Sequence, residues 1–265
     1  MLFRRKFAVS LYKNLKLRLA AVDFSKDVAE TDRANKYPLM SSTGEYTEKV
    51  CGGRYYFDGG SLTRYVFPLY PNAMNEVTVG ELSGECGFVF EHGNDTLKFT
   101  LNNSDKLCVC FECDGKKEKI AVDGSFRSGM RFAVLERKNL FDIYIKRNDY
   151  AEYICTFEAD EFSDCSSESF FKSTSVGLYF SGKVVCTGAE AFDDSGIAQA
   201  DIRPVCYENG DVITENGRVF LTASLRAQAG GCQGVLSWIP GTAEFELVGT
   251  LFFNTGDGRW ENDVA

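Results

Sequence analysis

Short runs in which apolar and polar residues alternate fill the chain from about residue 46 to residue 193. In Phe141–Ile145 the odd positions are apolar, so one face of this segment can be buried against an opposing sheet. Turn residues separate such runs at intervals of about ten residues, a spacing typical of an antiparallel β-sandwich. Strands are predicted at Arg54–Phe57, Val77–Leu82, Gly87–Glu91, Thr96–Leu101, Leu107–Glu112, Lys119–Val122, Arg131–Glu136, Phe141–Ile145, Tyr153–Phe157, Ser175–Phe180 and Val184–Ala189.

The pattern changes after the polar segment Asp193–Gly196, where we place a domain boundary. Glycine-containing and Pro-Gly-Thr turns then join four further runs of β-forming residues. Four antiparallel strands in about fifty residues have the size of one β-propeller blade. The four strands are predicted at Ile202–Cys206, Val219–Leu225, Gly234–Trp238 and Glu244–Phe253.

Residues 1–39 form a third, basic and amphipathic segment. This segment is predicted to pack on the next domain, either as an amphipathic helix or as a strand in which Leu15, Leu17 and Leu19 alternate with polar residues. Membrane-surface binding is the alternative. Lys13 and Lys16 interrupt the apolar stretch that a secretory signal would need, and no run of about twenty apolar residues predicts a membrane span.

Composition agrees with β-structure, because aromatic residues make up 14% of the chain and 25 glycines punctuate it. The 29 basic and 38 acidic residues give a formal charge of −9, which argues against a nucleic-acid partner. A neutral ligand such as a sugar is compatible with this charge.

Ten cysteines raise the question of disulfides or metal. Cys108, Cys110 and Cys113 lie in one strand-like run, where Cys108 and Cys110 share a face and cannot easily pair. We interpret the cysteines as reduced thiols in a cytoplasmic protein. Zinc is the alternative, but C-x-C-x-x-C lacks the paired knuckles and nearby histidine of strong zinc sites, so neither a metal nor a cofactor is predicted.

The stretch GRYYFDGGSLTRYVFPLYPNAMNEVTVGEL contains the turn Phe57–Ser61 and a strand near Val77. It resembles the start of a concanavalin A-like or laminin G-like jelly-roll domain, and the resemblance covers roughly residues 40–193. Many domains of this kind bind carbohydrate, and many others only pack against a catalytic neighbour. The resemblance therefore implies carbohydrate as a partner without implying catalysis.

The segments Ala200–Val205 and Gly217–Ser224 are similar to the first blade of the five-bladed glycosidases related to glycoside hydrolase family 43. Ser237–Gly249 resembles the outer hairpin of that blade, and Asp257–Val264 resembles the entry into the second. The resemblance implies that residues 196–265 form the first blade and the start of the second in an incomplete propeller.

Two departures from the family pattern favour the broader propeller superfamily over family 43 itself. Ile202 stands where the family has proline, and Glu261-Asn262 replace Ala-Pro. An incomplete propeller also leaves an open edge, through which self-association is expected.

If the correspondence holds, Asp201 is the general base, a carboxylate that takes a proton from the attacking water. The resemblance also places Trp260 and Asp263 near the sugar, as a stacking surface and a hydroxyl acceptor. The acid would come from later blades. The chain is thus predicted to be the N-terminal part of a glycoside hydrolase, inactive by itself. Alternatively, Asp201 is a turn former and Trp260 a hydrophobic plug.

A second hypothesis is a non-catalytic carbohydrate-binding or interaction module. Here Tyr55, Tyr56 and Tyr65 would form a stacking platform for sugar rings. His92 is the one histidine, and its neighbours are typical of a surface turn, which argues against histidine-dependent nucleophilic catalysis.

Overall fold

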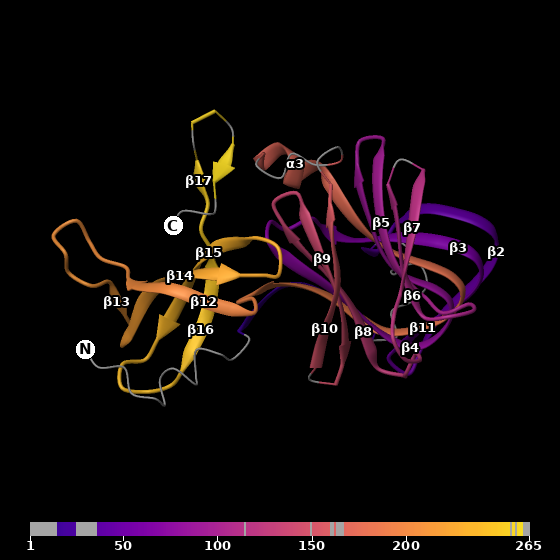
Figure 1. Ribbon diagram of the computed structural model, residues 1–265, viewed down its shortest axis with the longest axis horizontal. Helices are drawn as coiled ribbons and strands as arrows, with labels where there is room; N and C mark the ends of the chain where they lie inside the picture. Colours follow the sequence, from indigo (N-terminus) through magenta and orange to yellow (C-terminus); the bar gives the residue numbers. More distant parts are fainter. Residues whose placement is uncertain are drawn as a thin grey trace.

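The computed structural model describes residues 15–24, 36–113, 115–148, 150–159, 162, 167–254, 256–257 and 259–261. The predicted all-β, antiparallel sandwich is confirmed, with the short helix α3 (Glu168–Ser173) beside it. Figure 1 shows a large β unit on the right and a smaller sheet on the left.

The large unit is one sheet that folds into two layers across two long strands. Layer A has the strand order β7-β6-β5-β4-β11-β3-β2, and layer B has the order β10-β9-β8-β4-β11-β1. Both layers share β4 (Ala73–His92) and β11 (Thr174–Asp194). The other strands are β1 (Lys16–Asp23), β2 (Leu39–Cys51), β3 (Arg54–Pro68), β5 (Asp95–Asn102), β6 (Cys108–Cys113), β7 (Lys116–Ala121), β8 (Met130–Arg137), β9 (Leu140–Arg147) and β10 (Tyr150–Glu158).

β4 and β11 were each predicted as two strands, and this prediction was wrong. Their antiparallel pairing runs from Thr174 opposite His92 to Asp193 opposite Ala73, interrupted by bulges. The sequence marks a break at Gly84, but a Cβ there would lie 2.0 Å from the Ser181 carbonyl oxygen. This glycine therefore allows close backbone approach within a continuous strand pair.

Aromatic side chains join the two layers. The ring of Phe90, on β4, lies 5.5 Å from that of Phe141, on β9, and 6.1 Å from that of Phe99, on β5. Phe141, Ile143 and Ile145, on the face of β9 that was predicted to be buried, are fully buried, and Asp142 and Tyr144 on its other face are buried as well. Burial of each such side chain contributes about 1.5–3 kcal/mol.

The described part of the N-terminal segment takes the strand alternative. β1 pairs with the end of β11, from Lys16 opposite Asp194 to Asp23 opposite Gly188. Leu15 and Leu17 pack on the apolar core of the smaller sheet. Residues 15–23 therefore contact both β units.

The smaller sheet contains the four predicted strands, each hydrogen-bonded to the next along the chain, with the two-residue β13 at its side. Leu221, Leu236 and Leu247 lie on its buried face. This meander has the strand order of a propeller blade, whereas the propeller itself stays a prediction. The strands are β12 (Ala198–Pro204), β13 (Thr214–Glu215), β14 (Arg218–Arg226), β15 (Gly231–Trp238) and β16 (Phe245–Thr250), followed by the hairpin β17 (Phe253–Asn254) and β18 (Trp260–Glu261).

The turn between β14 and β15 docks on the outer face of layer B. The Asp142 carboxylate accepts hydrogen bonds from the backbone amides of Gln228 and Ala229, at 3.0 and 3.1 Å. Ala227 packs in a small apolar cluster with Tyr144 and four other residues of layer B. These contacts fix the smaller sheet against the sandwich.

A buried cation lies at the same junction. Arg137 is 1% exposed, donates a 3.0 Å hydrogen bond to the Asp194 carbonyl and contacts the Cys232 sulfur. Asp193, Asp194 and Ser195, at the predicted domain boundary, are themselves buried. The chain thus passes between the two units through a packed segment.

Candidate functional site

Asp201 lies in β12 at an irregularity between Ala200 and Arg203. Its φ of +51° is in the left-handed region, which is uncommon for a residue other than glycine. Its side chain is 56% exposed, accepts a 3.3 Å hydrogen bond from Ser224 and lies 3.8 Å from an Arg226 nitrogen. The carboxylate is therefore open to solvent beside one hydroxyl and one guanidinium group.

The other two residues predicted at this site lie wholly or partly outside the described part of the chain. Trp260 begins β18, but its side chain is outside the described part of the chain, as is the whole of Asp263. The roles of Asp201, Trp260 and Asp263 stay predictions.

The predicted tyrosine platform needs a correction. Tyr55 is 1% exposed and lies in the core, with its ring 5.3 Å from that of Phe24 and 4.9 Å from that of Phe180. Successive residues of a strand point to opposite faces, so Tyr56 points outward where Tyr55 points inward. Because Tyr55, Tyr56 and Phe57 are all aromatic, the sequence did not show which of them point into the core.

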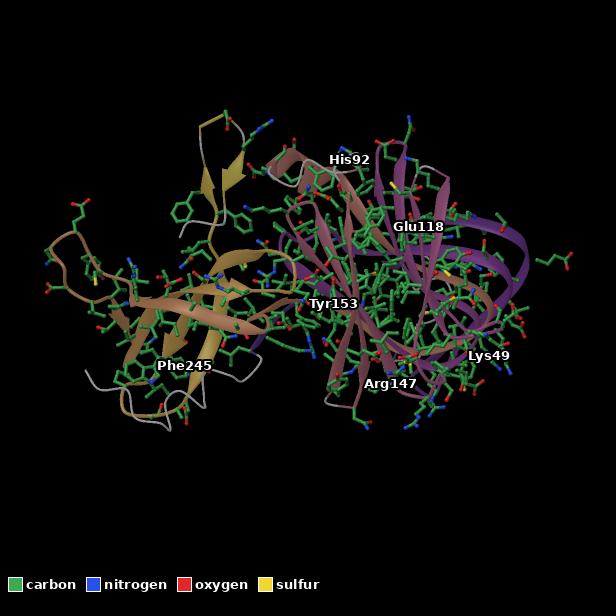
Figure 2. All side chains as sticks on the ribbon, viewed as in Figure 1. Lys49, His92, Glu118, Arg147, Tyr153 and Phe245 are labelled. Atoms are coloured by element: carbon green, nitrogen blue, oxygen red, sulfur yellow. The ribbon has the colours of Figure 1, made fainter. Side chains whose placement is uncertain are left out.

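Tyr56 and Tyr65 are partly exposed on the outer face of layer A, and Tyr179 joins them there. The strand register places Tyr179 opposite Thr63 and Gly87, and Tyr65 opposite Gly177. In Figure 2, Lys49, which pairs with Tyr56, lies at the end of the sandwich away from the smaller sheet. Tyr153, on layer B, lies toward that sheet.

Charged and amide side chains surround Tyr179 on this face. The Lys98 ammonium lies 4.5 Å from the centre of the Tyr179 ring and 2.9 Å from a Glu112 oxygen. The Glu85 carboxylate accepts a 2.8 Å hydrogen bond from the Asn102 amide. We call Tyr56, Tyr65, Tyr179, Glu85, Lys98, Asn102 and Glu112 the layer A platform.

Electrostatics keep the platform charged at neutral pH. Burial alone would raise the pKa of Glu112, but the ammonium groups of Lys98 and Lys117 outweigh burial and hold that pKa below its usual range. The same partnership raises the pKa of Lys98 although burial opposes it. Both side chains are therefore ionised and held in place.

A second charged cluster lies on layer B, where the Glu76 and Lys146 side chains are buried and Arg131 is 30% exposed. Glu76 is 3% exposed and pairs with Lys146 at 2.7 Å and with Arg131 at 3.2 Å. Burial would raise the pKa of Glu76, yet these cations lower it. Lys16 covers the neighbouring Phe192 ring at 3.8 Å. We interpret this cluster as structural.

His92 packs on the sandwich and forms hydrogen bonds with neighbouring hydroxyl groups. His92 Nδ1 lies 3.1 Å from the Thr174 hydroxyl, and its ring packs on Phe170 at 4.8 Å. Among the residues that the structure describes, no three His, Cys, Asp or Glu side chains form a metal-binding group, and no helix is long and apolar enough to cross a membrane.

Comparison with known proteins places the chain in no family. No protein-family model and no curated protein matches its sequence. Among solved structures it is similar to a putative β-glucanase from Mycobacterium abscessus, with 10% identity, a TM-score of 0.46, and 66% of this chain and all of that chain covered.

Two further structures show similar likeness. The carbohydrate-binding module CBM66 from Bacillus subtilis gives 11% identity and a TM-score of 0.41 over 57% of this chain and 91% of that one. A GH43 protein from Bacillus licheniformis shows 14% identity and a TM-score of 0.44, with 66% of this chain and 39% of that chain covered. At these scores the likeness assigns no activity.

Most of the layer A platform was missed in the sequence. Tyr179, Lys98 and Glu112 belong to three different strands and meet only through register. Their shared signal is a polar or aromatic residue at the outward position of each strand, which becomes informative once the strand pairing is known.

Proposed function

We propose that the chain is a non-catalytic carbohydrate-binding protein and that the layer A platform is its binding surface. The observation that carries this proposal is the open row of fixed polar groups around Tyr179. Sugars combine an apolar ring face with many hydroxyl groups, so their binding needs both an aromatic surface and oriented hydrogen-bonding groups.

Each part of the platform has a role in such binding. Glu85 and Glu112 offer carboxylate oxygens that accept hydrogen bonds from sugar hydroxyls, and Lys98 offers donors, while the buried Asn102 amide holds Glu85 in place. Their contacts with one another hold them in position before a ligand arrives, which lowers the entropic cost of binding. Tyr65, opposite Gly177, supplies ring surface beside Tyr179, whereas Tyr56 lies further along β3, opposite Val185.

The choice of layer A over layer B rests on coverage. The turn containing Ala227 occupies part of the outer face of layer B, and the Glu76 and Lys146 side chains of that layer are buried. Over the described residues, the charged part of layer A retains partial exposure, with 19% of the Lys98 side chain and 27% of the Glu112 side chain accessible.

A glycan array probed with the whole chain tests this proposal. Tyr179→Ala and Glu85→Gln are each expected to lower the affinity for the glycan that the array selects by about tenfold, or about 1.4 kcal/mol. The matched control is Tyr150→Ala, which removes a ring that is 68% exposed on layer B. Absence of glycan binding, or equal loss in the control, would show that the proposal is wrong.

The second candidate is a glycoside hydrolase in which Asp201 is the general base. The positive φ of Asp201 favours it, because strained residues and bulges are concentrated at functional sites. On this proposal the chain by itself hydrolyses no glycoside, since the acid belongs to further blades.

The test uses a longer protein in which further blades follow this chain. Asp201→Asn is expected to lower kcat for an aryl glycoside by about 10²–10⁴-fold, the usual contribution of a general base. Asp211→Asn, in an exposed turn of the same unit, is the control. Normal turnover in Asp201→Asn would exclude the role.

A further inference from the structure

The groups of the layer A platform come from successive strands of the sheet. Tyr65 lies on β3, Tyr179 on β11, Glu85 on β4, Lys98 on β5 and Glu112 on β6. These five strands are paired in that order. Neighbouring strands lie about 4.8 Å apart, so the platform extends roughly 19 Å across the strands.

A row of hydroxyl groups extends this surface by one more strand, to β2 at the edge of layer A. Ser181 lies opposite Glu85, Ser61 opposite Ser181, and Thr43 opposite Ser61. Because residues directly opposite each other share a face, the three hydroxyl groups lie on the same outer face as Glu85. A 2.7 Å hydrogen bond joins the Thr43 and Ser61 hydroxyls. Thr43 is exposed, and Ser61 and Ser181 are partly exposed.

The polar groups therefore follow an oblique path over the sheet. Lys98 pairs with Val89, four residues beyond Glu85 on β4, and Glu112 pairs with Lys98. The path starts at the hydroxyl groups of β2 and β3, passes Tyr179 on β11 and ends at the charged pair on β5 and β6. Its groups are spread out rather than directed at one point.

A spread of this kind suits several sugar units in a row. One sugar ring is about as wide as one strand spacing, about 4.8 Å, so a single terminal sugar contacts groups on two neighbouring strands. In a linear chain, each following unit reaches the groups of the next strand. We propose that the platform binds the interior of a linear polysaccharide chain, with Thr43, Ser61 and Ser181 as further binding residues. This inference rests on the proposed carbohydrate binding and adds the class of ligand.

The chemistry changes along the path. A hydroxyl group both donates and accepts hydrogen bonds, so Thr43, Ser61 and Ser181 match sugar hydroxyls of either orientation. The hydrogen bond between Thr43 and Ser61 holds two of these groups in position before binding. At the other end, Lys98 donates and Glu112 accepts. A chain therefore meets uncharged groups at β2 and charged groups at β6, which favours one direction of binding.

A glycan array tests the ligand class. It carries linear oligomers of glucose, mannose, xylose, galactose, fructose and N-acetylglucosamine, each from one to six units, and is probed with the whole chain. Within a series that binds, the affinity is expected to rise by about two- to tenfold per added unit, because each unit adds hydrogen bonds. Oligomers blocked at both ends are expected to bind as tightly as unblocked oligomers of the same length.

The double variant Thr43→Val/Ser61→Ala removes both hydroxyls of the bonded pair, so neither is left without its partner. Its affinity for the hexamer is expected to be about tenfold lower, the effect of losing one or two hydrogen bonds. The matched control is Thr47→Val, which changes an exposed threonine of the same strand, opposite Asp58 and away from the row. Equal melting temperatures would show that the variants fold.

The outcomes separate this inference from the proposed function. Absence of binding in every series would refute carbohydrate binding itself. Binding that is equal for one unit and for six, or that is lost when the ends are blocked, would overturn only the inference of interior binding. That inference is also overturned if Thr43→Val/Ser61→Ala binds the hexamer as tightly as the wild type does, or if Thr47→Val loses as much affinity.

Discussion

Asp142 is a buried carboxylate that links the two β units. It is 1% exposed and accepts hydrogen bonds from two backbone amides of the smaller unit and from Thr156 at 2.5 Å. Asp142→Ala leaves these donors without their acceptor and should lower the free energy of unfolding by about 1.5–3 kcal/mol. Urea denaturation measures the loss.

Asp58→Ala is the control for this experiment, because Asp58 is exposed on β3. A surface substitution of this kind is expected to change stability by less than about 0.5 kcal/mol. If both variants lose the same stability, the amide contacts of Asp142 contribute nothing specific.

Asp193 gives a prediction about pH. Burial raises its pKa from 3.8 to about 6, although the nearby Arg137 guanidinium opposes the shift. Between these values the unfolded state has lost the proton and the folded state has not, so stability falls as pH rises and the penalty is complete above pH 6.

Asp193→Asn removes this penalty because the amide does not ionise. Its advantage over the wild type should be smallest at pH 4 and should grow by about 1–3 kcal/mol toward pH 7. Urea unfolding at four pH values follows the difference. A difference that is constant with pH would contradict the assigned pKa.

At the scale of the element, Gly87 tests how closely the strands of layer A approach one another. A Cβ on Gly87 would lie 2.1 Å from the Phe99 carbonyl oxygen and 2.7 Å from the Thr100 Cα. Gly87→Ala must push β4 away from β5 and should cost about 1–3 kcal/mol. Thermal unfolding reports the change.

Gly249→Ala is the matched control, since a Cβ there meets nothing within 4 Å. This variant should keep or slightly raise the melting temperature, because alanine restricts the unfolded chain more than glycine does. A larger loss at Gly249 than at Gly87 would refute the close-approach argument.

Alternation predicted most of the strands but not how they join. Phe141–Ile145 showed its buried face directly, since every second residue is apolar. Gly84 and Gly182 in the sequence indicated turns, although they serve close contact between long strands. No local pattern separates these two uses of glycine, because the difference lies in the partner strand.

The site was harder to predict than the fold for the same reason. Tyr56 and Tyr65 were found by their exposure-prone aromatic side chains, but Tyr179, Lys98 and Glu112 come together only through strand register. Register between distant strands is a tertiary property that one sequence does not reveal. The prediction that Tyr55 is exposed was wrong, because its ring is buried in the core.

At the scale of the whole molecule, the buried contacts of Arg137 with Asp194 and Cys232 link the two β units, so we expect the units to unfold together. Both tryptophans of the chain, Trp238 and Trp260, lie in the C-terminal part, so tryptophan fluorescence reports on that part while far-UV circular dichroism reports on all strands. In the wild type the two urea transitions should coincide.

Arg137→Ala should separate them. Loss of the guanidinium group leaves the buried Asp193 and Asp194 without a compensating positive charge and should lower the free energy of unfolding by about 3–5 kcal/mol. The fluorescence transition should then come at a lower urea concentration than the circular dichroism transition. Arg54→Ala, at an exposed position, should leave both transitions in place. Coincident transitions in Arg137→Ala would show that the junction does not couple the units.

The shared strand pair of the sandwich has a consequence for biosynthesis. β4 ends at His92, and its partner β11 begins only at Thr174. At ribosomal rates of about 5–20 residues per second, β4 emerges roughly 4–16 s before the strand that covers its long edge. During that interval the nascent chain exposes an unpaired edge flanked by phenylalanines, which makes it a substrate for chaperones that bind extended apolar segments.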